Sequence, residues 1–78
     1  MAGWAINKIY GDVDKSSTKS TFFRVAHVEY NGRQYVDVRE HFPKANGGAQ
    51  HTKTGIAIPV ADAAKLIEVL QAAVNELG

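Results

Sequence analysis

The chain has 78 residues, a formal net charge of +1 and no cysteine. This length allows one small domain, and the lack of cysteine excludes disulfide bonds and thiolate metal sites. No apolar run approaches the roughly 20 residues of a membrane span, and we expect no signal peptide. Because small domains without disulfides or metals are often completed by self-association, we expect an oligomer.

The charge is unevenly distributed along the chain. Residues 1–58 hold eight Lys/Arg against five Asp/Glu, whereas residues 59–78 hold one Lys against three Asp/Glu. A basic part followed by an acidic part is compatible with an anionic partner that binds one side of the molecule. An ordinary solvated surface would also account for these charges.

The first half of the chain contains two predicted strands. Residues 4–10 (WAINKIY) are apolar, β-branched or aromatic at several positions, and residues 21–30 (TFFRVAHVEY) are rich in Phe, Val and Tyr. These compositions are typical of β-strands. Residues 11–20 (GDVDKSSTKS) are small and polar, so they are predicted to form a loop.

A hairpin follows the second strand. Asn31-Gly32 lies between two β-rich runs, which is the strongest short hairpin signal because a type I′ turn needs positive φ at both central residues. Residues 33–42 are therefore predicted to be the returning strand. Alternation in this strand places two sets of side chains on opposite faces. One face carries Val36 and Val38, and the other carries Tyr35, Asp37 and Arg39.

The remaining segments are a loop, a strand and a helix. Residues 43–52 open with Pro43 and contain Asn-Gly-Gly, which predicts a loop. Residues 53–58 are predicted to be a short strand, in which Gly55 marks a bulge or a close approach of two backbones. From Pro59 onward the pattern is helical.

Apolar residues of the helix recur at three- and four-residue spacing, as at Leu66, Leu70 and Leu77. Asp62 lies in the first turn, where a negative charge suits the helix dipole. The stripe could cover the sheet of its own chain or pair with a second copy, and the two are compatible. The predicted fold is α+β, with the order β-β-β-β-α in a single domain over residues 1–78.

Motifs for catalysis are absent. The sequence has no Gly-rich phosphate loop, no GxSxG elbow and no HExxH. The spacing of His27, His41 and His51 matches no zinc pattern. Asp37 and Glu40 are three positions apart on a strand, so they face opposite sides and form no acid–base pair. We therefore expect a protein without enzymatic activity, cofactor or metal.

The hairpin region combines cations with aromatic rings. Sequence-tolerant binding of a single nucleic-acid strand needs cations along the phosphates and exposed rings on which bases stack. The alternative is that Tyr30, Tyr35 and Phe42 pack in the core or across strands. The candidate binding residues are Tyr30, Arg33, Arg39, Phe42, Lys44 and Lys53.

The run from Tyr35 to Phe42 (YVDVREHF) resembles the strand motif of the transcriptional positive cofactor four family. In that family an apolar-Asp-apolar-Arg-Glu run and two aromatics precede a Gly-containing loop, a basic stretch, a Gly-Ile strand and a C-terminal helix. The corresponding pieces here lie between Asn46 and Leu77. The resemblance covers residues 21–77, and the Asp-Val-Arg-Glu and Gly-Ile pieces at this separation make it fairly specific.

The resemblance implies a curved four-stranded antiparallel sheet with one C-terminal amphipathic helix. It also implies a homodimer that binds single-stranded DNA with little sequence preference, in transcription or in replication, recombination and repair. Residues 21–78 would then be the DNA-binding core and dimerisation helix, and residues 1–20 an N-terminal strand and loop. The implied partners are single-stranded DNA, a second copy of the chain, and transcription or replication proteins, with no membrane.

The resemblance also implies roles for individual residues. Arg39 matches a strand arginine that contacts phosphates, Phe42 stands where the family has a stacking tryptophan, and Tyr30 stands where it has a stacking phenylalanine. Arg33 matches a lysine after the hairpin glycine, and Lys53 belongs to a basic pair.

The sequence departs from the family at several positions. Thr54 replaces the second cation of the basic pair, Gln50 stands where a lysine is usual, and His41 replaces a tyrosine. A less basic site should bind with lower affinity and with a shallower salt dependence. Residues 1–20 lack the long Ser-rich region of the eukaryotic coactivator, which favours a prokaryotic or phage protein.

Two other functions are compatible with the sequence. The helix could recruit a protein of the transcription machinery as an adaptor, or the same cations and rings could bind RNA. We expect an intracellular location with DNA, in the host cytoplasm or nucleoid for a prokaryotic or phage protein and in the nucleus for a eukaryotic one.

Overall fold

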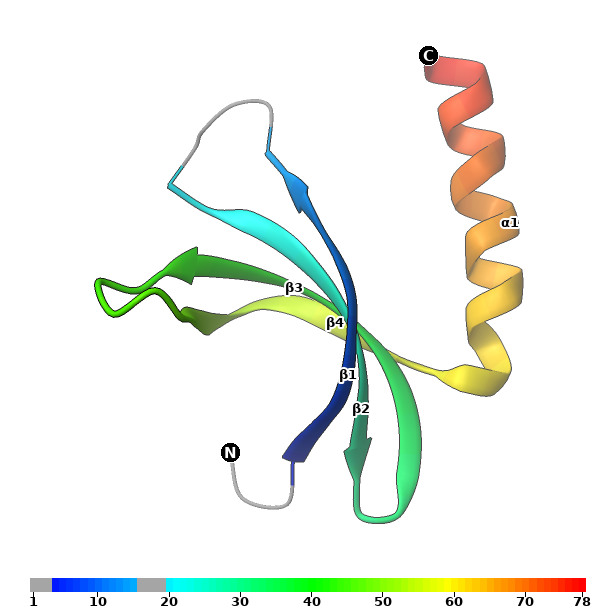
Figure 1. The fold of residues 1–78 in the computed structure, drawn as a ribbon. Helices are drawn as coiled ribbons and strands as arrows, with labels where there is room; N and C mark the ends of the chain where they lie inside the picture. The colour runs from blue at the N-terminus through cyan, green and yellow to red at the C-terminus, as the bar shows by residue number, and fades with distance from the viewer. Residues whose placement is uncertain (1–3, 16–19) are drawn as a thin grey trace.

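The computed structural model describes residues 4–15 and 20–78, which form four strands and one helix (Figure 1). The sheet has the order β1-β2-β3-β4, and each neighbouring pair is antiparallel. This confirms the predicted α+β fold and its element order. The elements are β1 (Trp4–Asp14), β2 (Phe22–Tyr30), β3 (Arg33–Pro43), β4 (Ala49–Pro59) and α1 (Val60–Leu77).

Two strands are longer than predicted. β1 continues to Asp14 through part of the predicted loop, of which residues 16–19 lie outside the described residues. β4 begins at Ala49 instead of residue 53, so the predicted loop over residues 43–52 shrinks to residues 44–48. In both places, pairing with a long neighbouring strand overrides the low strand propensity of small polar residues.

The turn between β2 and β3 has the expected conformation. Asn31 has φ 52° and Gly32 has φ 75°, as a type I′ turn requires. The turn sets Tyr30 opposite Arg33 and fixes the register of the whole hairpin. We call the side of the sheet that carries Asp37 the aspartate face, and the side that carries Val36 the valine face.

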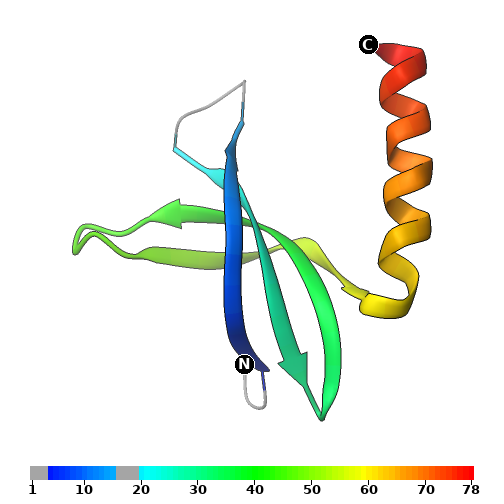
Figure 2. The ribbon, with the colours of Figure 1, turned by 45° about the vertical axis from the view of Figure 1, so that its right-hand side comes forward.

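The buried residues of the strands lie on the aspartate face. The sheet itself is strongly twisted and curved (Figures 1 and 2). Among the described residues, Ala26, Val28, Asp37 and His41 are less than 5% exposed, and the register places all four on this face. The core of the single chain is therefore small and includes two polar side chains.

The outer edge strand β1 is irregular. Its pairing with β2 shifts between Ile6 and Lys8 and again between Ile9 and Gly11, so one extra residue enters β1 at each place. Such bulges increase the local twist of a strand.

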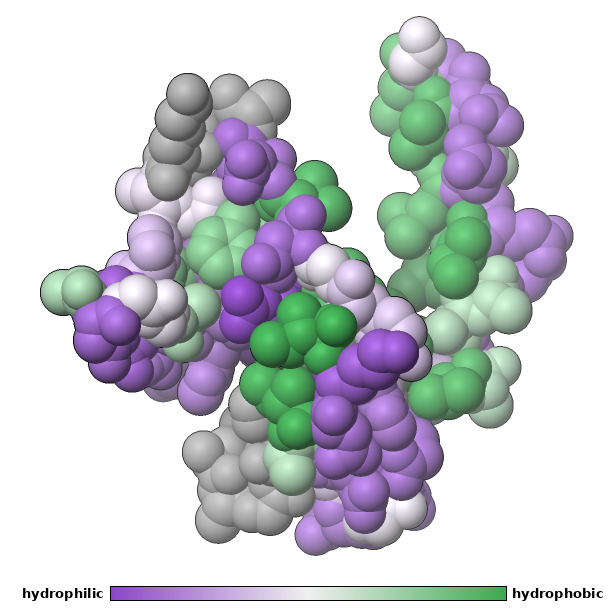
Figure 3. Space-filling view, in the orientation of Figure 1, coloured by the Kyte–Doolittle hydropathy of each residue, from purple (hydrophilic) through white to green (hydrophobic). Residues whose placement is uncertain are grey.

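The helix stands apart from the sheet. No residue of α1 is buried, and both ribbon views show it joined to the sheet only through the end of β4 (Figures 1 and 2). Figure 3 shows hydrophobic residues along the side of α1 that looks toward the sheet, with open space between them. The interpretation that the stripe covers its own sheet is therefore wrong. Large apolar side chains of α1 that are more than half exposed are Val60, Ile67, Val69, Leu70, Val74 and Leu77.

The helix ends are formed as expected. Asp62 lies in the first turn, and the Gly78 amide donates to the carbonyl of Val74 at 2.7 Å. In the part of the chain that the structure describes, no helix combines the length and apolar character needed to cross a membrane.

Candidate nucleic-acid interface

The tip of the β2–β3 hairpin brings together two aromatic rings and a cation. Tyr30 lies opposite Arg33 on the neighbouring strand. Tyr35 lies two residues after Arg33 and therefore on the same face of the sheet. With Asn31, these residues line a depression of about 400 Å³. Two of the predicted site residues, Tyr30 and Arg33, therefore lie side by side.

Three of the predicted cations are exposed and unpaired within the described part of the chain. No ion pair there involves Arg33, Lys44 or Lys53. Such side chains can contact phosphates without first breaking an ion pair within the protein. By contrast, the Nζ of Lys15 lies 3.3 Å from a carboxylate oxygen of Glu40.

Arg39 is held by the protein itself. Its Nη2 donates to one carboxylate oxygen of Asp37 at 2.9 Å, and its Nε lies 3.2 and 3.1 Å from the two oxygens. Its Nη1 donates to the carbonyl of Thr52 at 3.2 Å. Asp37 is 2% exposed and needs such a partner, because a buried unpaired carboxylate is costly. Since a guanidinium has five N–H groups and three are engaged, about two remain for a phosphate.

The close approach predicted at Gly55 is confirmed. Gly55 lies opposite Arg39, and a Cβ on it would lie 2.7 Å from the Arg39 Cα and from the Val38 carbonyl oxygen. The β3–β4 register shifts immediately beyond, between Arg39 and His41. A side chain at position 55 would therefore push β4 away from the Arg39–Asp37 pair.

A second arginine of the aspartate face was missed by the sequence analysis. Arg24 lies opposite Arg39 and donates to the Asp12 carboxylate from Nε at 2.8 Å and from Nη2 at 3.1 Å. This hydrogen bonding lowers the pKa of Asp12 and raises the pKa of Arg24, while desolvation acts in the opposite direction on each. The hairpin register could have placed Arg24 beside Arg39, but its partner on β1 could not be foreseen.

The remaining predicted residues lie toward the other end of β3. Phe42 is 40% exposed and pairs with Gln50, and strand alternation places it on the opposite face from Arg39. Lys44 follows in the loop before β4, where its amide donates to the Gly48 carbonyl at 2.8 Å. Phe42 lies nine residues after Arg33 along the strand, which corresponds to roughly 30 Å. The predicted residues thus form a track along β3 and the neighbouring β4, with Phe42 on the opposite face from Arg39, and not one pocket.

His41, which stands where the family has a tyrosine, is 4% exposed. Its ring stacks on Phe22 at 5.9 Å between centroids and meets His51 edge-on at 6.4 Å. Its Nδ1 lies 3.0 Å from the carbonyl oxygen of Arg39. The described residues contain no cluster of three or more side chains that could hold a metal ion.

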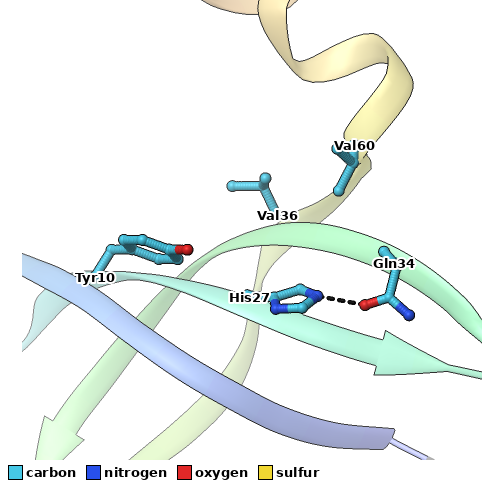
Figure 4. Close-up of a pocket in the computed structure, with 5 residues that line it drawn as sticks. All are labelled: Tyr10, His27, Gln34, Val36 and Val60. Atoms are coloured by element: carbon cyan, nitrogen blue, oxygen red, sulfur yellow. Dashed lines mark hydrogen bonds between the residues drawn. The ribbon is translucent and has the colours of Figure 1, made fainter.

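A second depression of about 400 Å³ lies on the valine face, beside the start of α1 (Figure 4). In it, the His27 Nε2 and the Gln34 Oε1 form a hydrogen bond. None of the predicted binding residues reaches this depression. Its lining residues are Tyr10, His27, Gln34, Val36 and Val60.

Comparison with known proteins agrees with the fold. The model of the family described as Transcriptional Coactivator p15 (PC4) matches residues 17–69. Two crystal forms of a PC4 homolog from Burkholderia pseudomallei have similar structures. One has a TM-score of 0.74 and 34% identity, and covers 92% of this chain and 97% of the homolog. The other has a TM-score of 0.72 and 36% identity, and covers 86% of this chain and 96% of the homolog. No curated protein sequence matches the chain significantly.

Proposed function

This chain belongs to the Transcriptional Coactivator p15 (PC4) family, and we propose that it binds single-stranded DNA as a homodimer with little sequence preference. The observation that carries the proposal is the pairing of rings with unpaired cations along β3. Tyr30 and Arg33 lie together at the hairpin tip, and Phe42 and Lys44 are exposed two residues apart at the opposite end of β3. Rings of this kind stack on any base, and the cations follow the phosphates.

The charges of the site predict a moderate salt dependence. Arg33, Lys44 and Lys53 are the unpaired cations of the proposed track, and each neutralised phosphate contributes about 0.7 to the slope of log affinity against log salt. With three such cations, log affinity should fall by about 2 for each unit of log salt concentration, per protomer. This corresponds to a roughly 20-fold loss of affinity between 50 and 200 mM salt.

The binding test is a fluorescence anisotropy titration with a short mixed-sequence single strand, its duplex and the same sequence as RNA, at several salt concentrations. We expect the single strand of DNA to bind most tightly. Lys53→Ala should lower the salt slope by about 0.7. The matched control is Lys65→Ala, because the Lys65 Nζ lies 3.5 Å from Glu68 on α1, away from the track. If the duplex binds more tightly than the single strand of DNA, the proposal is contradicted. If the RNA binds more tightly than the single strand of DNA, the preferred ligand is single-stranded RNA.

The exposed apolar stripe of α1 supports the homodimer. A helix with a continuous apolar face must bury it against another element to be stable, and the sheet of the same chain leaves it exposed. On the sheet, Ile56 is 55% exposed and belongs to the valine face through its pairing with Val38. A second copy can cover α1 and this part of the valine face while leaving the aspartate face open.

The dimer is tested by replacing one apolar residue of α1. Leu70 is 57% exposed, and Leu70→Glu places a charge in the centre of the stripe. The protein should then behave as a monomer by light scattering at concentrations where the wild type is a dimer. Gln71→Glu introduces the same charge one residue away and should leave the dimer intact. A wild-type monomer at high micromolar concentration would rule out the homodimer.

Membership of this family supports an association with DNA. We propose that it acts inside the cell in transcription regulation or in DNA replication, recombination or repair. Binding alone accounts for the arrangement of the site, and no step of the proposal requires catalysis.

A further inference from the structure

We infer that the depression at the hairpin tip accepts a single purine base of the bound strand. The inference rests on the proposed function and adds a local base preference to it. The depression measures about 400 Å³, which lies within the usual range for sites that hold one small molecule. Its lining residues are Tyr30, Asn31, Arg33 and Tyr35.

Two rings border the depression on the same face of the sheet. Tyr30 is 36% exposed, and Tyr35 is half-buried two residues beyond the partner of Tyr30. The family resemblance assigns stacking to the position of Tyr30 only, whereas Tyr35 contributes a second aromatic wall. A base held between two rings gains more from stacking when it is a purine, because its ring system is larger.

The polar side chains of the depression fit the outer edge of a purine. Arginine donates to N7 and O6 of guanine, and asparagine pairs with N6 and N7 of adenine. Arg33 forms no ion pair within the described residues, so its donors are available. Asn31 is held at φ 52° by the turn, which fixes the backbone that presents its carboxamide. Pyrimidines lack N7 and lose these contacts.

The position of the depression keeps it accessible in the proposed dimer. It lies on the aspartate face, whereas Val60 at the start of α1 lines the other depression, on the valine face, to which the exposed Ile56 also belongs. A second copy on the valine face would leave the hairpin tip open to the strand.

The experiment compares two ten-nucleotide strands, one of thymines only and one with a single guanine or adenine in its centre. The wild type should bind the purine-containing strand about five- to tenfold more tightly. Tyr35→Leu should reduce this ratio to about one, whereas Tyr35→Phe, which keeps the ring, should retain it. Tyr10→Leu removes an exposed tyrosine near the other depression and should leave the ratio unchanged.

The outcomes separate this inference from the proposed function. Equal affinities of the wild type for the two strands would overturn the inference and leave single-strand binding intact. The inference would also be overturned if Tyr35→Leu keeps a wild-type circular dichroism spectrum and still prefers the purine-containing strand by the same ratio as the wild type. If neither strand binds, both the proposed function and the inference fail.

Discussion

Replacing Arg39 by alanine should damage the fold before it affects nucleic-acid binding. The change would leave the Asp37 carboxylate, which is 2% exposed, without the three guanidinium contacts that now solvate it. Breaking a buried ion pair from one side typically costs about 3–5 kcal/mol. A domain of this size has a free energy of unfolding of roughly 4–12 kcal/mol, so the loss is a large fraction of the total.

The assay is urea unfolding followed by circular dichroism at a single protomer concentration, because the proposed self-association would make the midpoint depend on concentration. With a slope of about 1–2 kcal/mol per molar urea, the midpoint should fall by roughly 2 M or more. The double variant Asp37→Leu with Arg39→Met removes both charges and should recover most of the stability. A cost below about 1 kcal/mol for Arg39→Ala would refute the reasoning, because exposed ion pairs contribute only that much.

Three other changes test further features of the structure. Gly55→Ala should destabilise the fold by about 1–3 kcal/mol in the same assay, because its Cβ would lie 2.7 Å from the Arg39 Cα. A stability like that of the wild type would argue against the close approach. Thr54→Lys should increase the affinity for single strands and steepen the salt slope by about 0.7, and an unchanged slope would show that the bound strand does not reach position 54. The pKa of Asp12 is lowered by its hydrogen bonds from Arg24, so the stability that this pair contributes is present at neutral pH and is lost as the pH falls below about 4. Asp12→Asn should therefore flatten the acid limb of a plot of urea midpoint against pH, and an unaltered limb would contradict this assignment.

The order of the elements could be predicted because local signals agree with one another. The Asn31-Gly32 turn fixes both the hairpin and the pairing of every residue along β2 and β3. Alternation then separates the faces that carry Val36 and Asp37. The helix could be predicted from its apolar period alone. Each of these signals is local to one turn, strand or helix, so the rest of the chain was not needed to interpret them.

The partners of the charged residues could not be predicted in the same way. The pairing of Arg24 with Asp12 depends on two bulges in β1, and no turn signal specifies where these fall. Arg39 was expected to meet phosphates, and its sequence neighbours do not reveal that Asp37 is buried beside it. The helix presents a related difficulty, because an amphipathic pattern shows which side is covered but not by what.

The irregular edge of the sheet has a consequence for solubility. β1 is an exposed strand whose residues 4–10 are largely apolar or aromatic, and a flat strand of this kind would template the addition of further chains. The bulges beside Ile6 and Ile9 interrupt its regular ladder and twist it, and Lys8 between them adds a charge. A neighbouring molecule therefore finds no long run of correctly spaced amides and carbonyls at this edge. The bulges thus disfavour growth of the sheet by addition of further chains.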